Sequence, residues 1–464
     1  MKKLKFEYLK GSFFYSLPGI LSIFLSLISI PIFLQLLGNT EFADYLMQHF
    51  ILTFSIILNC NFGKIVCINI SKKISEKNNY IYTVLILNIF TTILFSTLFF
   101  LALEQIITYF NIVNLNALKD SSILFGLMIS NFYLTLEGIY KGALKYKSLS
   151  LFNFLFYSLS MSFPALLLII DRTEQTPFTI SLIIKFLSVL IMTIYIFPKA
   201  INRLKISKQL IKDLKKLSGW ITINTTVHQV YNYFDKYIIK AFFNNQLFIF
   251  YSISQQISSK IAIPLNAYHN IYISKLSKNY KNKKAKEHLS NSLLTYSLFM
   301  FFFILLFFPF LEELLRRWLT SSYSNEYHNL LKIFFMIVMF SSLSNLLIDH
   351  YDINSRSKIS SFYEICFMPI FFILVYCAII NKSIFIFALS ILLKDMLLFL
   401  IRVLNTKQEI FDKKIIFISL FLSTLAWIFS FYSIEYFYYL IFFQLIVLIK
   451  MLPIKKLIIF YNQN

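Results

Sequence analysis

Long apolar runs separated by short polar connections recur along the whole chain. About 20 consecutive apolar residues are enough to cross the hydrocarbon core of a bilayer as a helix. The pattern therefore predicts an all-α membrane protein of about fourteen spans. No connection is longer than about twenty residues, so we expect no inserted soluble catalytic domain. The predicted spans are 13–37, 42–70, 80–103, 121–143, 150–170, 178–198, 216–241, 247–274, 289–311, 327–350, 360–380, 384–401, 415–432 and 435–452.

Composition supports the membrane prediction, and the distribution of charge sets the orientation. The chain is 58% hydrophobic and only 14% charged, whereas soluble domains are about a quarter charged. The formal net charge of +22 would suit a nucleic-acid partner. However, with a cytoplasmic N-terminus most of the lysines and arginines fall in connections on the inner side, as the positive-inside rule requires. We therefore expect cytoplasmic termini and no nucleic-acid partner.

A weak internal repeat relates two halves of the chain. The segment Leu36–Lys73 recurs as Phe242–Asn279 without a gap, and Phe42 and Tyr45 match Phe248 and Tyr251. Such long-period symmetry is common in transporters built from two membrane halves. Chance similarity between two apolar, aromatic-rich segments is the alternative.

The connection 199–217 is the natural boundary between the halves. Its leucines and isoleucines follow a helical period with lysines opposite, which predicts a basic amphipathic helix on the inner membrane surface. The predicted units are therefore 1–198 with helices 1–6, the linker 199–217, 218–404 with helices 7–12, and 405–464 with helices 13–14 and a cytoplasmic tail.

Two local features bear on helix packing. Pro18 and Pro31 lie in the first span, where prolines are tolerated if neighbouring helices satisfy the freed backbone groups. In the fourth span, Gly138 and Gly142 have the four-residue spacing that lets two helices approach closely. We therefore expect partners for the freed carbonyls of the first span and a close contact at the fourth.

Several segments resemble one family of exporters. They are LLGNTEFADY, NFGKIVCINISKK, EGIYKGALKYKSLSLFN, and NYFDKYIIKAFFNNQLFIFYSISQQISSK with the later LSK. They resemble Wzx-type O-antigen and polysaccharide flippases of the multidrug/oligosaccharidyl-lipid/polysaccharide exporter superfamily. The chain departs from that pattern in one respect, because its first span carries no charge although early cavity helices of these flippases often carry arginine.

The resemblance implies a fold and a function. The fold would be two six-helix lobes around a central cavity, with two further helices. The function would be transfer of an undecaprenyl-pyrophosphate-linked oligosaccharide, for O-antigen or lipopolysaccharide synthesis, across the bacterial inner membrane. Implied partners are this lipid-linked oligosaccharide, membrane lipids, H⁺ or Na⁺ as coupling ion, and a polysaccharide polymerase as a candidate.

Two other function classes stay open. A drug or cation antiporter of the same superfamily would need carboxylates in its cavity, whereas the candidates here are mainly lysines. An O-antigen polymerase, a membrane glycosyltransferase, would need a large outer loop, which the pattern lacks. We expect no enzyme activity, no cofactor and no metal site. No G-x-x-x-x-G-K phosphate loop occurs, and Cys60 and Cys67 have no nearby histidine or carboxylate in the sequence.

Lysines within spans are the candidate substrate-binding residues. A charge at the bilayer centre needs a partner, a wet cavity or a function. Lys260 lies near the middle of the eighth span, where it would bind the diphosphate or pair with a carboxylate. Lys64 is close enough to the inner face to bind substrate or to extend into the interface. Lys185 and Lys394 are also deep.

The candidate coupling or gating residues are ionisable groups in other spans. Histidine titrates near neutral pH, so His228 is either a protonation switch or a packing residue. Asp235 and Lys236 would form an interface ion pair, and Glu137 would face Lys64 or lie at the inner surface. Because adjacent helical positions do not face each other, Lys394 and Asp395 are expected to have separate partners. The full set is Asp235, Lys236, His228, Glu137 and Asp395.

Overall fold

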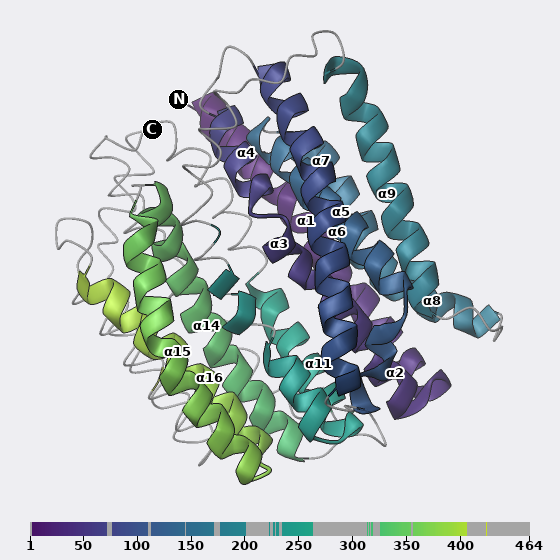
Figure 1. The fold of residues 1–464 in the computed structure, drawn as a ribbon, viewed down its shortest axis with the longest axis vertical. Helices are drawn as coiled ribbons and strands as arrows, with labels where there is room; N and C mark the ends of the chain where they lie inside the picture. The colour runs from purple at the N-terminus through teal and green to yellow at the C-terminus, as the bar shows by residue number, and fades with distance from the viewer. Residues whose placement is uncertain are drawn as a thin grey trace.

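The chain folds into long, roughly parallel helices, as the computed structural model in Figure 1 shows. The structure describes residues 2–71, 77–109, 113–143, 145–170, 177–200, 234–262, 325–353 and 356–405, with single positions at 222, 226–227, 229–231, 313, 315, 317–318 and 424. Every regular element within these ranges is helical. The helices are α1 Lys2–Leu36, α2 Gly38–Ile51, α3 Ser55–Leu58, α4 Phe62–Ser71, α5 Lys77–Tyr109, α6 Ser122–Gly142, α7 Tyr146–Asn153, α8 Ser160–Ile170, α9 Pro177–Ala200, α11 Asn245–Ile261, α14 Asn325–Ile353, α15 Ser357–Ile380 and α16 Ile384–Asn405.

The described helices agree with most of the predicted spans. In the described part of the chain, eight helical stretches are long and apolar enough to cross a membrane. They coincide with predicted spans 1, 3, 4, 5, 6, 10, 11 and 12. Large apolar side chains on them face outward, among them Phe90, Ile194 and Ile373, as expected for lipid contact. The linker 201–217 and predicted spans 9, 13 and 14 lie outside the continuous described ranges, so the total of fourteen stays a prediction.

Two groups of helices stand side by side in Figure 1. The first group is α1 to α9, and the second group is α11, α14, α15 and α16 with the helical residues 234–242 before α11. Helix α11 packs on α14 within the second group and on α2 of the first group. The surface where α1 and α2 meet the second group is called the seam below. The predicted division into units at 198 and 218 stays a prediction.

The second predicted span is broken rather than continuous, which corrects the sequence interpretation. Helix α2 passes through a short 3₁₀ turn, Leu52–Phe54, into α3, which ends at Leu58. Cys60 and Asn61 then have positive φ angles of 49° and 56°, in the left-handed region, before α4 begins at Phe62. Asparagine tolerates this region better than most residues. The fifth predicted span is also irregular, because α7 joins α8 through a π-helical segment, Phe154–Leu159.

The break is held by buried amide side chains. The Nδ2 atom of Asn59 lies 2.8 Å from the main-chain and side-chain oxygens of Asn131 and from the Thr135 hydroxyl. Asn88 donates to the Asn131 side chain at 3.0 Å, and the Gly63 amide donates to Asn59 Oδ1 at 3.2 Å. Polar groups inside a bilayer must be paired within the protein. The polar residues around Asn59 therefore serve, at least in part, to close the ends of a broken helix.

Helices α4 and α6 touch backbone to backbone, which confirms the close approach predicted from the glycine spacing. A Cβ atom on Gly138 would lie 2.1 Å from the Gly63 carbonyl oxygen, and one on Gly63 would lie 2.4 Å from the Leu134 carbonyl oxygen. At Gly142 a Cβ would meet Cys67 and Ile70 at about 3 Å. Only glycine fits at Gly138, since the obstructing atoms belong to the backbone.

The first helices of the two repeat segments begin at nearly matching positions and bury matching aromatic residues. Helix α2 starts at Gly38 and α11 starts at Asn245, one residue beyond the position that matches Gly38. Phe42 and Tyr45 are buried in α2, as Phe248 and Tyr251 are in α11. The repeat-related helices also pack against each other across the seam.

We predict that Gly138→Ala destabilises the protein by several kcal/mol, because overpacking against movable side chains already costs about 1–3 kcal/mol. The matched control is Gly126→Ala, whose added Cβ would meet only the terminal methyl groups of Leu52 and Leu182. The unfolding midpoint of each purified variant in detergent measures the effect. Equal midpoints for the two variants would contradict the backbone contact.

Candidate functional site

A small pocket lies in the seam, between α1, α2, α8 and α11. Serine hydroxyls and one glutamine provide its polar surface, and aromatic and aliphatic side chains provide the rest. Helix α1 contributes a stripe, because Ser22, Ser26 and Ser29 are spaced to share one helix face. The lining residues are Ser26, Ser29, Ile30, Phe33, Phe42, Tyr45, Leu46, Met161, Ser162, Ile253 and Gln256.

Lys260 lies beside this pocket, one helical turn after Gln256 on α11. Its Nζ atom donates to the Ser22 hydroxyl of α1 at 2.6 Å, so the side chain crosses the seam. Among the described residues no carboxylate pairs with it. The ammonium charge is therefore held by a neutral hydroxyl group, at the place where the two groups meet.

Helix α2 is joined to the second group by an ion pair and by aromatic rings near the start of α11. Lys240, which is 2% exposed, lies 2.8 Å from Asp44 of α2 and donates to Asn245 at 2.7 Å. Phe50 of α2 meets Phe248 of α11 edge to face, with ring centroids 6.3 Å apart. These contacts join the repeat-related helices directly.

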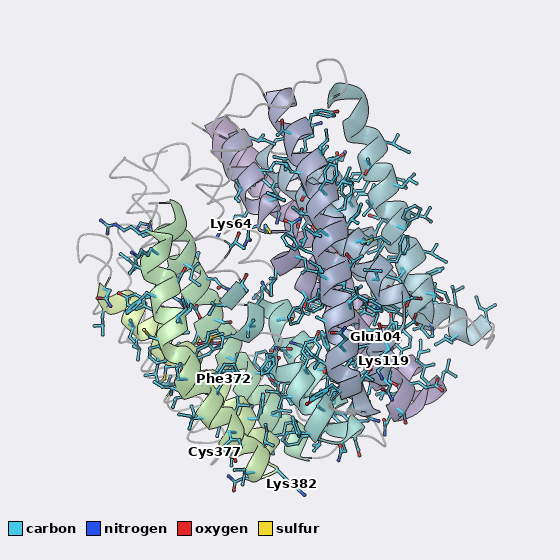
Figure 2. The ribbon with its side chains drawn as sticks, viewed as in Figure 1. Lys64, Glu104, Lys119, Phe372, Cys377 and Lys382 are labelled. Carbon is cyan, nitrogen blue, oxygen red and sulfur yellow. The ribbon has the colours of Figure 1, made fainter. Side chains whose placement is uncertain are left out.

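Lys64 and Glu137 lie where α4 packs on α6. Lys64 follows Gly63, and Glu137 precedes Gly138, so the glycine contact brings both residues to one level. Glu137 is buried and pairs with Lys141 on its own helix at 3.0 Å. In the view of Figure 2, Lys64 lies between α4 and α14, toward the second group.

Lys185 is enclosed within the first group rather than placed at the seam. Its Nζ atom donates to the Phe156 carbonyl at 3.2 Å and stands 4.4 Å from the centroid of the Phe156 ring. Phe156 belongs to the π-helical segment, whose wide turn presents that carbonyl. The side chain is 6% exposed and has no carboxylate partner among the described residues.

Six charged side chains are buried together in the second group. Arg402 of α16 binds Glu364 of α15 and the Ser344 hydroxyl of α14. Tyr231 donates to the Glu364 carbonyl at 2.6 Å, and its ring lies 4.5 Å from Lys394 Nζ. Their acids and bases balance, so the cluster is neutral. Its members are Asp235, Lys236, Glu364, Lys394, Asp395 and Arg402, each at most 6% exposed.

Two ion pairs in this cluster join neighbouring residues, which corrects one expectation. Lys394 Nζ lies 3.0 Å from Asp395 Oδ1, although the two were predicted to need separate partners. The long lysine chain folds back far enough to reach the next residue. Asp235 also meets Lys236, at 3.5 Å, and accepts a hydrogen bond from the Tyr251 hydroxyl. That pair is buried, and Lys236 Nζ also lies 4.8 Å from the centroid of the Phe50 ring of α2.

Three buried charged residues were not selected from the sequence, namely Glu364, Arg402 and Lys240. Glu364 is an acid inside a predicted span, so the rule that singled out the lysines also applies to it. Arg402 lies one residue beyond the predicted end of its span. Lys240 follows Lys236 by one turn and lies next to the end of its predicted span, where a lysine is common. His228 lies outside the described residues.

The family model for polysaccharide biosynthesis proteins matches residues 32–326, which is more than half of the chain. The chain belongs to this family. No curated protein matches the sequence significantly.

Solved structures with the same fold are membrane transporters. A MOP superfamily transporter from Pyrococcus furiosus has a TM-score of 0.63 at 12% identity, covering 85% of this chain and 94% of its own. The MATE transporter ClbM in complex with Rb⁺ gives 0.60 at 11%, covering 89% and 96%. The Vibrio cholerae MATE transporter VcmN gives 0.61 at 10%, covering 87% and 96%.

These comparisons confirm the family resemblance and the all-helical membrane fold inferred from the sequence. The polysaccharide biosynthesis protein is thus a multi-pass membrane protein with the fold of MOP superfamily transporters. At 10–12% identity the structural likeness establishes the fold alone.

We predict that Glu364→Gln destabilises the protein by about 3–5 kcal/mol, because it leaves the buried Arg402 guanidinium without its counter-charge. Glu313→Gln is the matched control, since Glu313 pairs with Arg317 at a site where both side chains are mostly exposed. That change should shift stability by at most about 0.5 kcal/mol. Unfolding in detergent measures the stability of both variants. Similar losses of stability would contradict the argument that burial makes the Glu364–Arg402 pair the more important one.

The pair across the seam gives a second prediction. Asp44→Lys should lower stability by about 1 kcal/mol through loss of the ion pair and repulsion from Lys240. The exchanged pair, Asp44→Lys with Lys240→Asp, should regain part of that loss because the attraction is restored. If the double variant loses as much stability as the two single variants together, the ion pair contributes nothing to stability.

Proposed function

We propose that this protein turns an undecaprenyl-pyrophosphate-linked oligosaccharide from the cytoplasmic to the periplasmic leaflet of a bacterial inner membrane. The oligosaccharide is one repeat unit of O-antigen or a related polysaccharide. Transport proceeds by alternating access, in which the two helical groups separate at the seam on one side of the membrane at a time. The observation that carries the proposal is Lys260, a cation that crosses the seam without a carboxylate partner among the described residues.

A diphosphate is the ligand that this arrangement favours. Lysine binds phosphate as a compact, hydrated point charge, and charge-assisted hydrogen bonds are stronger than neutral ones. The Ser22 hydroxyl is a weak acceptor that a phosphate oxygen can replace. Serine hydroxyls and the Gln256 amide lie along the same seam and suit the polar sugar that follows the diphosphate.

The remaining lysines have different places in the proposal. Lys64, near the first group's surface toward α14 in Figure 2, is the second candidate for the diphosphate. Lys185 and Lys394 have contacts inside their own groups, so we assign them to the packing of each group.

Coupling to an H⁺ or Na⁺ gradient is proposed for the acids of the second group. Asp395 Oδ2 is buried and has no hydrogen-bond partner in the described part of the chain, so it can accept a proton or an ion. Asp235 and Lys236 lie in the same cluster. A polysaccharide polymerase is the proposed recipient of the transferred repeat unit.

The alternative function is a drug or cation antiporter, which the likeness to MATE transporters favours. Such a protein would need acidic groups where a cation binds. At the seam, however, Asp44 is paired with Lys240, and the cation Lys260 follows the pocket residue Gln256 by one helical turn. This balance of charge favours an anionic substrate.

We predict that Lys260→Glu abolishes transfer of the lipid-linked diphosphate while the protein still inserts into the membrane. Lys260→Met should lower the rate by about tenfold or more, because a charge-assisted bond contributes about 1.5–3 kcal/mol. Lys382→Glu is the matched control, since Lys382 is exposed in the turn between α15 and α16, as labelled in Figure 2. Proteoliposomes that contain a labelled undecaprenyl-diphosphate oligosaccharide measure the transfer.

Gene deletion separates the two functions in cells. Deletion should remove surface polysaccharide and leave single lipid-linked units on the cytoplasmic leaflet, and the wild-type gene should restore export. A fully active Lys260→Glu variant would exclude Lys260 from the site. Loss of small-cation export with unchanged polysaccharide would instead support the antiporter.

A further inference from the structure

A tryptophan of the second half of the sequence contacts a carbonyl of α1 that has lost its helical donor. In an α-helix each carbonyl accepts from the amide four residues later, but proline has no amide hydrogen. Pro31 therefore leaves the Leu27 carbonyl without that donor. Trp318 Nε1 donates to this oxygen at 2.7 Å, which fulfils the expectation that a neighbour would satisfy the backbone freed in the first span.

The position of this bond along α1 is what gives it functional interest. Leu27 lies between Ser22, which holds Lys260, and Ser29, which lines the pocket. The bond from Trp318 and the bond from Lys260 therefore meet the same stretch of α1, about one turn apart. Between them, Ser26 faces the pocket with Gln256.

A second side-chain donor, from the seventh predicted span, also reaches the first group at an irregular turn. The Thr222 hydroxyl donates to the Cys60 carbonyl at 3.0 Å, and Cys60 is one of the two left-handed residues in the broken second span. Side-chain donors at residues 222 and 318 are thus directed at helix irregularities of the first group. Such oxygens are good acceptors because regular helical hydrogen bonds are interrupted there.

We propose that Trp318 is a positioning residue for transport, which holds α1 at its Pro31 irregularity so that the serine stripe stays opposite Lys260. This proposal rests on the proposed function for its effect on transport. The hydrogen bond itself does not depend on the substrate. When Trp318 releases the Leu27 carbonyl, α1 loses a fixed point on the seam, and Ser22 is no longer held at the right distance from Lys260.

Removal of the donor alone tests the proposal. Trp318→Phe keeps an aromatic ring but lacks the N–H group. We expect the KM for the labelled undecaprenyl-diphosphate oligosaccharide to rise about fivefold, as the loss of one ordinary hydrogen bond implies, with the maximal rate within about twofold of wild type. Trp427→Phe, the same change in the thirteenth predicted span, is the control and should leave the KM unchanged.

Pro31→Ala supplies the decisive second variant, because alanine restores the main-chain amide that can donate to the Leu27 carbonyl. In this background Trp318→Phe should have no further effect on the KM. An unchanged KM in the single Trp318→Phe variant overturns the proposal. Additive losses in the double variant also overturn it, since Trp318 would then act through packing and not through this bond.

A measurement without substrate separates this proposal from the proposed function. The four proteins (wild type, Trp318→Phe, Pro31→Ala and the double variant) form a cycle of unfolding midpoints in detergent. Coupling between the two positions supports the bond even if the lipid-linked oligosaccharide proves not to be the substrate. If Trp318→Phe and Pro31→Ala change the unfolding midpoint independently, the proposed role of the hydrogen bond is overturned, whatever the substrate is.

Discussion

The structure depends on one constraint of the bilayer, which is that every buried charge and every freed backbone group must find a partner inside the protein. The constraint accounts for the amide cluster around Asn59, which surrounds the break in the second predicted span. It accounts for the neutral cluster of acids and bases in the second group. It also accounts for the bond from Trp318 to the carbonyl that Pro31 leaves without a donor.

Against this background Lys260 and Lys185 differ from the paired charges, since neutral groups hold both; Lys260 lies at the seam, and Lys185 lies inside the first group. In the charged cluster of the second group, Lys236, Lys394 and Arg402 pair with acids, and Lys240 pairs with Asp44 across the seam. Lys260 instead meets a serine hydroxyl beside a pocket of hydroxyl, amide and aromatic groups. A cation kept in this way costs stability unless an anion completes the site at some stage. This difference supports the proposal that an anionic lipid binds at the seam.

The repeat-related helices give the seam its symmetry. Helices α2 and α11 begin within one residue of matching positions and pack through Phe50 and Phe248, and Asp44 of α2 pairs with Lys240 just before α11. Their remaining contacts differ, since Tyr45 donates to a main-chain carbonyl whereas Tyr251 donates to Asp235. The first group is thus joined mainly by neutral amide and hydroxyl contacts, and the second group by buried charge pairs.

The sequence by itself predicted the class of protein, the eight spans found among the described residues and the close contact at Gly138, because hydropathy, charge and small-residue spacing are local properties of a chain in a bilayer. It also led to Lys260, since a lone lysine in a long apolar run is visible without any structure. Only the tertiary structure decided which charges are paired. The reach of Arg402 to Glu364 joins α16 to α15, and the break at Cys60 and Asn61 lies against Asn131 of α6 through Asn59. The pair of Lys394 and Asp395 depends on how the lysine side chain folds back. No local pattern encodes these neighbours, so a residue such as Trp318 acquires its role only where distant segments meet.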